Sequence, residues 1–227
     1  MKKIFSLSSQ TISVLILIVL CLIMWIFRIK LTGETKGFFL AWNLFLAFLP
    51  LGFILLARKI FRIFGFKDII TKSVVYFFML LWLLFFPNSP YIITDLIHLN
   101  HLPEDLLWFD ALGIYLTATT GLVVGLYSVD IFRVLTKNLF GKIISVFLTL
   151  FSLILSAFGV YLGRYIRLNS WDLFTNPLAL LRIVSGQLFE PLAIKMTIVF
   201  GLVLIGVYFS FNQFLNNYAN PENDPEF

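Results

Sequence analysis

The charged residues of this chain leave six long stretches that contain no Asp, Glu, Lys or Arg. Of its 227 residues, 60% are hydrophobic and 13% are charged, whereas a soluble domain carries nearer a quarter charged residues. Each stretch can supply the roughly 17–25 apolar residues that a membrane-spanning helix needs. The stretches lie between Lys3 and Arg28, Lys36 and Arg58, Lys72 and Asp95, Asp110 and Asp130, Lys142 and Arg164, and Lys195 and Glu222. This pattern predicts six spans.

The spans are predicted to be α-helices, because backbone groups find no water to bond inside a bilayer. Continuous apolar runs, rather than alternation, argue against an outer-membrane barrel and favour an all-α polytopic bundle. We interpret Thr11–Phe27 as a retained span, because no small-residue cleavage site follows it. Cys21 is the only cysteine, so an internal disulfide is excluded. We expect residues 1–211 to form one transmembrane domain and residues 212–227 a polar, disordered tail.

The distribution of basic residues predicts which loops face the cytoplasm, where lysine and arginine are enriched. Ten basic residues fall on one side: Lys2, Lys3, Arg58, Lys59, Arg62, Lys67, Lys72, Arg133, Lys137 and Lys142. The other side receives seven: Arg28, Lys30, Lys36, Arg164, Arg167, Arg182 and Lys195. The bias predicts that both termini are cytoplasmic. The loops after the third and fifth spans then share the outer face.

Small residues recur at every fourth position in the fourth span, and the fifth span has two pairs of small residues at the same interval, Ser152 with Ser156 and Gly159 with Gly163. This spacing puts them on one helix face and lets another backbone approach closely, so we expect these two spans to pack tightly together. The residues of the fourth span are Gly113, Thr117, Gly121 and Gly125.

The loop after the third span, Pro87 to Asp105, holds both histidines and three of the twelve acidic residues. Pro87 is predicted to end the span, since its ring and missing N–H disfavour helix continuation. Ser89 is expected to be extended because a proline follows it. From Tyr91 the sequence YIITDLIHL predicts a short helix that ends at Pro103.

On such a helix, Asp95, His98 and His101 fall at i, i+3 and i+6 and share one broad face. Asp and two His can bind a divalent metal such as zinc or manganese, with Glu104 or Asp105 as a fourth ligand. Two alternatives remain open. Asp95 and His98 can act as acid–base catalysts without metal, or the segment can be a solvated interfacial helix.

The loop after the fifth span begins GRYIRLNSWDLFTNP and places two arginines on the side where positive charge is disfavoured. Arg164 and Arg167 are three residues apart, so they share a face. Either they are locked to acidic residues, with Asp172, Asp95 or Asp105 as partners, or they bind an anion. For the second alternative we expect an anion or substrate site made by Asn88, Arg164, Arg167, Trp171 and Asp172.

The rest of that loop, LALLRIVSGQLFEPLAIK, is apolar but contains Arg182 and Glu190. These charges make it a poor seventh span, and we interpret it as an interfacial or re-entrant helix before the last span. Such a helix can cover a cavity that opens sideways to lipid.

Three motifs resemble a family of bacterial integral membrane proteins classed as a domain of unknown function. They are FFPNSPYIITDLIHL (Phe85–Leu99), GRYIRLNSWDLFTNP (Gly163–Pro177) and WNLFLAFLPL (Trp42–Leu51). The resemblance implies a multi-spanning protein of the bacterial cytoplasmic membrane and carries over no catalytic residues.

Three functions remain open. The first is an enzyme that acts at the extracytoplasmic face on a lipid-linked or otherwise anionic substrate, with arginines that hold the anion. The second is a structural or accessory subunit of a cell-envelope assembly, and the third is a transporter component. The chain lacks a Walker loop, a dinucleotide fingerprint, a G-x-S-x-G elbow and an H-E-x-x-H pair. Nucleic-acid binding is not expected, because the basic residues are dispersed over both faces.

Overall fold

The computed structural model describes residues 9–33, 38–101 and 106–219, and within these ranges every regular element is helical. The long helices are α1 (Ser9–Thr32), α2 (Phe38–Phe64), α3 (Ile69–Phe85), α5 (Leu107–Phe140), α6 (Lys142–Tyr161) and α9 (Pro191–Ala219). The short elements are α4 (Asn88–Tyr91), the 3-10 helix η1 (Ile92–His101), the π-helical turn η3 (Leu162–Ile166), α7 (Asp172–Thr175) and α8 (Pro177–Gln187). The predicted all-α architecture is confirmed.

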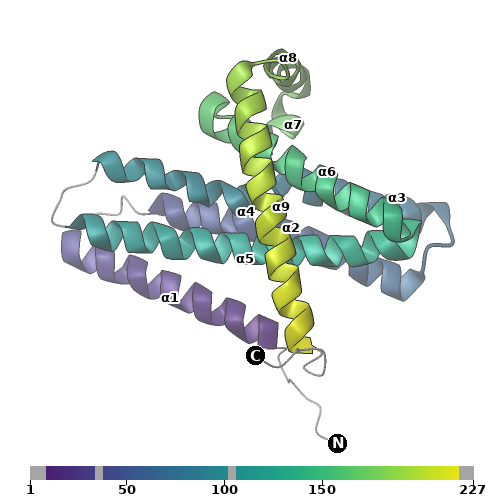
Figure 1. Cartoon of the computed structure of the whole chain (residues 1–227), viewed down its shortest axis with the longest axis horizontal. Coiled ribbons are helices and arrows are strands. Elements are labelled where there is room, and N and C mark those ends of the chain that lie inside the picture. Colours follow the sequence, from purple (N-terminus) through teal and green to yellow (C-terminus); the bar gives the residue numbers. More distant parts are fainter. Residues whose placement is uncertain (1–8, 34–37, 102–105, 220–227) are drawn as a thin grey trace, which may run out of the picture.

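Six helical segments of the described chain are long and apolar enough to cross a membrane, as predicted. They are Ile12–Thr32, Phe38–Phe64, Ile69–Ile97, Leu107–Phe140, Lys142–Ile166 and Pro191–Gln213. In Figure 1, α1, α2, α3 and α5 run in broadly the same direction, and α5 contacts α1, α2 and α6. Helix α9 packs against α6 and crosses the other long helices steeply in this view.

The ends of the helices follow local rules. Gly65, after α2, and Gly141, between α5 and α6, have φ of +76° and +85°, a conformation that glycine adopts without the steric penalty of a Cβ. Asp68 caps α3, because its carboxylate accepts hydrogen bonds from the Thr71 N–H (2.8 Å) and the Thr71 hydroxyl (2.7 Å). These two hydrogen bonds lower the pKa of Asp68 below its ordinary value.

Pro87 does not end the third span, which corrects the sequence prediction. The helical path continues through α4 and η1, and Ser89 is helical rather than extended. The break at Pro87 is bridged by other bonds: the Asn88 side-chain amide donates to the Phe85 carbonyl at 2.8 Å, and the Tyr91 N–H donates to the Pro87 carbonyl at 3.1 Å. Because Pro87 stands at the start of a new helical turn, its missing N–H removes no obligatory bond.

Helix α4 fits between the glycines of α5 and α6. A Cβ at Gly125 would lie 2.6 Å from the Ser89 Cβ, and one at Gly159 would lie 2.5 Å from the Pro87 Cγ. The Ser89 hydroxyl also donates to the Ala47 carbonyl of α2 at 2.9 Å. Helices α5 and α6 do contact each other, but these glycines accommodate the PNSPY segment rather than the partner span. This close approach is the reason glycine is needed at both positions.

The larger core cluster packs aromatic side chains among aliphatic ones. The Trp82 ring is stacked on Phe132, with ring centroids 4.0 Å apart, and its indole N–H donates to the Ser128 hydroxyl at 3.0 Å. Trp82 is fully buried and therefore satisfies its one polar atom within the bundle.

The last helix extends further than expected. Helix α9 continues to Ala219, into residues 212–227 that were predicted to form the polar tail. Asn212 donates to Asp130 at 3.0 Å and accepts from Arg133 at 3.4 Å, so polar contacts with α5 replace hydrophobic burial here. Residues 220–227 of the predicted tail lie outside the described ranges.

Candidate functional site

A cavity of about 690 Å³ opens where α2, α4 and the segment after α6 meet. Its walls combine arginine and neutral polar groups with aromatic and aliphatic side chains. The lining residues are Trp42, Asn43, Leu46, Leu84, Pro87, Asn88, Tyr91, Ile97, Gly159, Leu162, Gly163, Arg164, Arg167, Leu168, Asn169, Ser170, Trp171, Leu180 and Val184. The two loops that were predicted to meet at a common surface therefore both contribute to one pocket.

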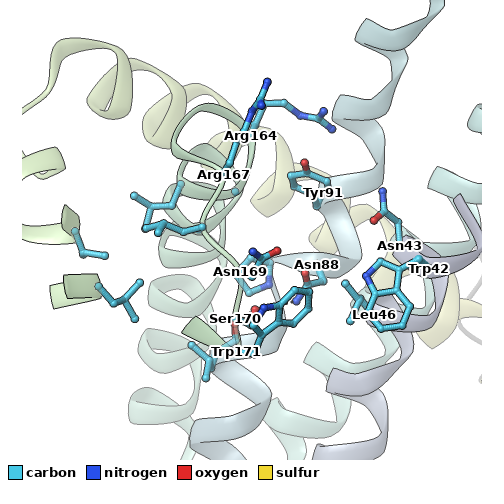
Figure 2. A pocket seen from close by; sticks show the side chains of 18 of the residues that line it. Trp42, Asn43, Leu46, Asn88, Tyr91, Arg164, Arg167, Asn169, Ser170 and Trp171 are labelled. Atoms are coloured by element: carbon cyan, nitrogen blue, oxygen red, sulfur yellow. Dashed lines mark hydrogen bonds between the residues drawn. The ribbon is translucent and has the colours of Figure 1, made fainter. Parts of the chain in front are cut away.

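The lining is cationic toward one end, whereas toward the other end two tryptophans lie beside Asn88 and Ser170 (Figure 2). Figure 2 shows Arg164 and Arg167 beside Tyr91, with the indoles of Trp42 and Trp171 further down the pocket. The Trp42 and Trp171 rings are 6.3 Å apart in an edge-to-face arrangement. Such a combination of a charged end and apolar walls is typical of sites that bind amphiphilic ligands.

At the cationic end, Arg164 of η3 is paired with Asp95 of η1. The Arg164 Nη2 forms an ion pair and hydrogen bond with the Asp95 Oδ1, and the side chains are only 13% and 2% exposed. The other carboxylate oxygen of Asp95 accepts a hydrogen bond from the Asn43 amide of α2 at 2.8 Å. Both oxygens of this buried carboxylate are thus occupied, as a buried charge requires.

Arg164 is also held by its neighbours on the third span. Its Nε and Nη2 donate to the Thr94 hydroxyl at 2.8 and 2.6 Å, and its guanidinium carbon lies 4.4 Å from the centre of the Tyr91 ring. The Thr94 hydroxyl in turn donates to the Tyr91 carbonyl at 2.6 Å. These contacts fix the plane of the guanidinium against the aromatic face.

Arg167 also lines the pocket but differs from Arg164 in its backbone conformation, its exposure and its hydrogen bonding. It follows the π-helical turn with a positive φ of 62°, which turns the chain out of the helix. Its side chain is exposed, lines the pocket and has no hydrogen-bond or ion-pair partner among the described residues. The predicted pair of arginines is therefore one locked cation and one cation that faces the cavity.

The remaining predicted anion-site residues divide between the pocket and its support. Asn88 and Trp171 line the cavity, and the Asn88 amide donates to the Ser170 hydroxyl at 3.1 Å. Asp172 does not line it. Its carboxylate accepts the Asn169 N–H at 2.7 Å and so holds the loop, whereas the sequence offered it as an arginine partner.

The metal hypothesis remains a prediction. Asp95 is held by Arg164 and Asn43, and the side chains of His98 and His101 lie outside the part that the structure describes. Glu104 and Asp105, proposed as a fourth ligand, lie outside it too. Among the described side chains no group of three His, Cys, Asp or Glu gathers at one point.

Sequence reasoning did not assign Trp42, Asn43, Tyr91 and Thr94 to the site. Asn43 was noticeable as a polar residue in the middle of an apolar span, and Trp42 opens the WNLFLAFLPL motif. Neither feature indicates a partner, because the contacts join α2 to the third span. A lone amide in an apolar span indicates a polar contact with another helix, since the amide needs a partner in the bilayer.

Comparison with known proteins gives one family and no individual relative. No curated protein and no solved structure matches the chain. A family model matches residues 42–207, which include α2 through most of α9 and all the residues that line the pocket. The chain belongs to the family described as protein of unknown function (DUF1361), and it is a multi-pass membrane protein of that family.

Proposed function

We propose that this protein binds an anionic amphiphile, a lipid or lipid-linked molecule, in the pocket between α2, α4 and α8. The observation that carries the proposal is the exposed guanidinium of Arg167, which has no partner among the described residues and lines a pocket with apolar walls. The Asn169 side-chain amide is a neutral donor in the same lining, whereas both N–H groups of the Asn88 amide are already used on the Phe85 carbonyl and the Ser170 hydroxyl. A planar guanidinium with a neutral donor nearby suits phosphate or carboxylate.

The apolar side of the pocket supports an amphiphile rather than a free anion. Leu180 and Val184 of α8 line the pocket, and Leu46 and Ile97 add aliphatic surface from α2 and η1. The outer surface of α8 is apolar as well, with Leu178 79% exposed. A helix with such a surface is suited to the membrane boundary, where it covers a pocket that lipid can enter sideways.

Binding is better supported than catalysis. Among the described side chains of the lining there is no carboxylate, imidazole or thiol, the groups that most often transfer protons or attack substrates. Asp95 is buried and forms an ion pair with Arg164, which favours a role in positioning the Arg164 guanidinium. The catalytic roles of Asp95 and His98, and an enzymatic function, stay predictions.

The pocket is proposed to face the outer side of the bacterial cytoplasmic membrane, with both termini inside. The excess of basic residues on the opposite loops supports this orientation. Labelling of single cysteines introduced at Arg182 and at Lys67, in a variant with Cys21 replaced by Ala, tests it in whole cells. Labelling at position 67 rather than 182 by an impermeant reagent would reverse the orientation.

Native mass spectrometry of the purified protein tests the binding proposal. We expect the wild type to retain an anionic lipid and Arg167→Ala to retain about tenfold less, because a hydrogen bond to a charged group is lost. Arg182→Ala is the matched control, since Arg182 is an exposed arginine of the same loop that does not line the pocket. Wild-type protein without anionic lipid, or equal retention in both variants, would refute the proposal.

A structural or accessory subunit is the second candidate, favoured by the direct Asp95–Arg164 bridge between two spans. In this case the same spectra should contain a second polypeptide at fixed stoichiometry and no retained lipid.

A further inference from the structure

We infer that the pocket selects a singly charged phosphodiester headgroup over a doubly charged phosphomonoester, because Asp95 cancels the charge of one of its two arginines. The inference rests on the proposed function and adds the charge class of the ligand. It predicts that the carboxylate behind the pocket, which the ligand never touches, sets the ligand's charge.

The first step is the state of Arg164. Its guanidinium is held by Asp95, Thr94 and the Tyr91 ring. Asp95 is 1% exposed and pairs directly with Arg164, so the two charges form a neutral unit. In a medium of low polarity such a unit attracts an anion much less than a lone arginine does.

The second step is the charge of the remaining lining. Arg167 supplies one positive charge that faces the cavity. The other polar lining residues, Asn43, Asn88, Asn169, Ser170 and Tyr91, are neutral. Asp172 neighbours Trp171 in the chain, but its carboxylate is turned to the Asn169 N–H and does not line the pocket. The described lining therefore offers a net charge of one to a ligand.

The third step is the match with headgroups. A phosphodiester carries one negative charge, whereas a phosphomonoester carries roughly 1.5 to 2 at neutral pH. A monoester would bring an uncompensated charge into a pocket with apolar walls, which is unfavourable. A diester is neutralised by Arg167 alone and can accept a hydrogen bond from the Asn169 amide.

The experiment measures lipid competition on the full-length protein by native mass spectrometry in mixed vesicles of phosphatidylglycerol and phosphatidic acid with identical acyl chains. We expect the wild type to retain phosphatidylglycerol in preference. We expect Asp95→Asn, which keeps the shape of the side chain but removes its charge, to raise the ratio of phosphatidic acid to phosphatidylglycerol by about tenfold or more. Asp110→Asn is the matched control, because it removes a carboxylate from the other buried arginine pair, which does not line the pocket.

The outcomes separate the two proposals. A wild type that retains neither lipid refutes the proposed function itself. A wild type that retains both lipids equally, or prefers phosphatidic acid, overturns the charge inference while binding stands. An unchanged ratio in Asp95→Asn, or the same shift in Asp110→Asn, overturns it as well. Dimethyl phosphate in large excess is the soluble arm: lipid that stays bound supports a lipid ligand, and displaced lipid identifies a free phosphodiester instead.

Discussion

Two arginine–aspartate pairs in the described part of the bundle look alike and differ in their surroundings. Arg28 of α1 contacts Asp110 of α5 in a two-bond arrangement at 2.5 and 3.0 Å, with side chains 12% and 7% exposed. Arg164 and Asp95 are buried to a similar extent, but Asp95 accepts a hydrogen bond from the Asn43 amide, and Arg164 lines a pocket that Arg167 also lines. A buried ion pair alone therefore indicates interhelical contact, and it is the pocket with a second arginine that supports the proposed binding.

The largest effect is expected from Arg164→Met. Removing the cation leaves the Asp95 carboxylate buried beside Asn43, which destabilises a protein by about 3–5 kcal/mol. We also expect lipid retention to fall, because Tyr91 and the loop that carries Arg167 lose their anchor. Thermal unfolding in detergent and native mass spectrometry measure the two effects. Unchanged stability would show that the pair at the pocket contributes nothing to the fold.

Arg28→Met is expected to destabilise the protein by a similar amount, about 3–5 kcal/mol, for the same reason. In contrast to Arg164→Met, the fraction of retained lipid in the folded protein should stay at the wild-type value, because neither Arg28 nor Asp110 lines the pocket. Both measurements are made on the same preparation. Loss of lipid with this variant would contradict the claim that only the Arg164–Asp95 pair affects lipid binding.

A smaller effect is expected from Asn43→Ala, which removes the amide that donates to Asp95. An unmet hydrogen bond at a buried carboxylate costs about 1–3 kcal/mol. Thr32→Ala is the control in the other pair. The Thr32 hydroxyl lies a long 3.5 Å from the Arg28 guanidinium and donates to the Arg28 carbonyl at 3.0 Å, so its loss should matter less to the ion pair. Denaturant unfolding measures the free energy of unfolding of both variants. An equal decrease in the two would mean that the Asn43 hydrogen bond to Asp95 contributes no more than the Thr32 contact.

The smallest effect concerns an exposed carboxylate, Asp68. Its pKa is lowered in the folded state from 3.8 by the Thr71 hydrogen bonds. The stabilisation is therefore present above the unfolded pKa and is lost as the pH falls through the lowered folded value. We expect the thermal midpoint of the wild type to approach that of Asp68→Ala in acid. A difference between the two that is independent of pH would contradict this assignment.

The sequence predicts the spans well because the signal is local. The charge-free stretches and continuous apolar runs identify six membrane-length helices, and LALLRIVSGQ identifies the short helix α8 before the last one. Bilayer physics makes such runs informative, since each must satisfy its own backbone.

Contacts between distant segments are less accessible from sequence. Local rules for proline wrongly ended the third span at Pro87, because they cannot foresee that the Asn88 amide bridges the break. Asp95 was one of three open partners for the arginines, and only the packing of η1 against α5 and α2 selects it. The Arg28–Asp110 pair could not be predicted from the sequence either, although both residues border charge-free stretches.

Helix α4 has a mechanical consequence for ligand entry. Because its turn is inserted among Ala47, Gly125 and Gly159, any outward movement would pull three long helices apart at once. Helix α8, by contrast, has no fully buried side chain and touches the pocket through Leu180 and Val184. We therefore expect a ligand to enter and leave the pocket by displacement of helix α8, while helix α4 keeps its position.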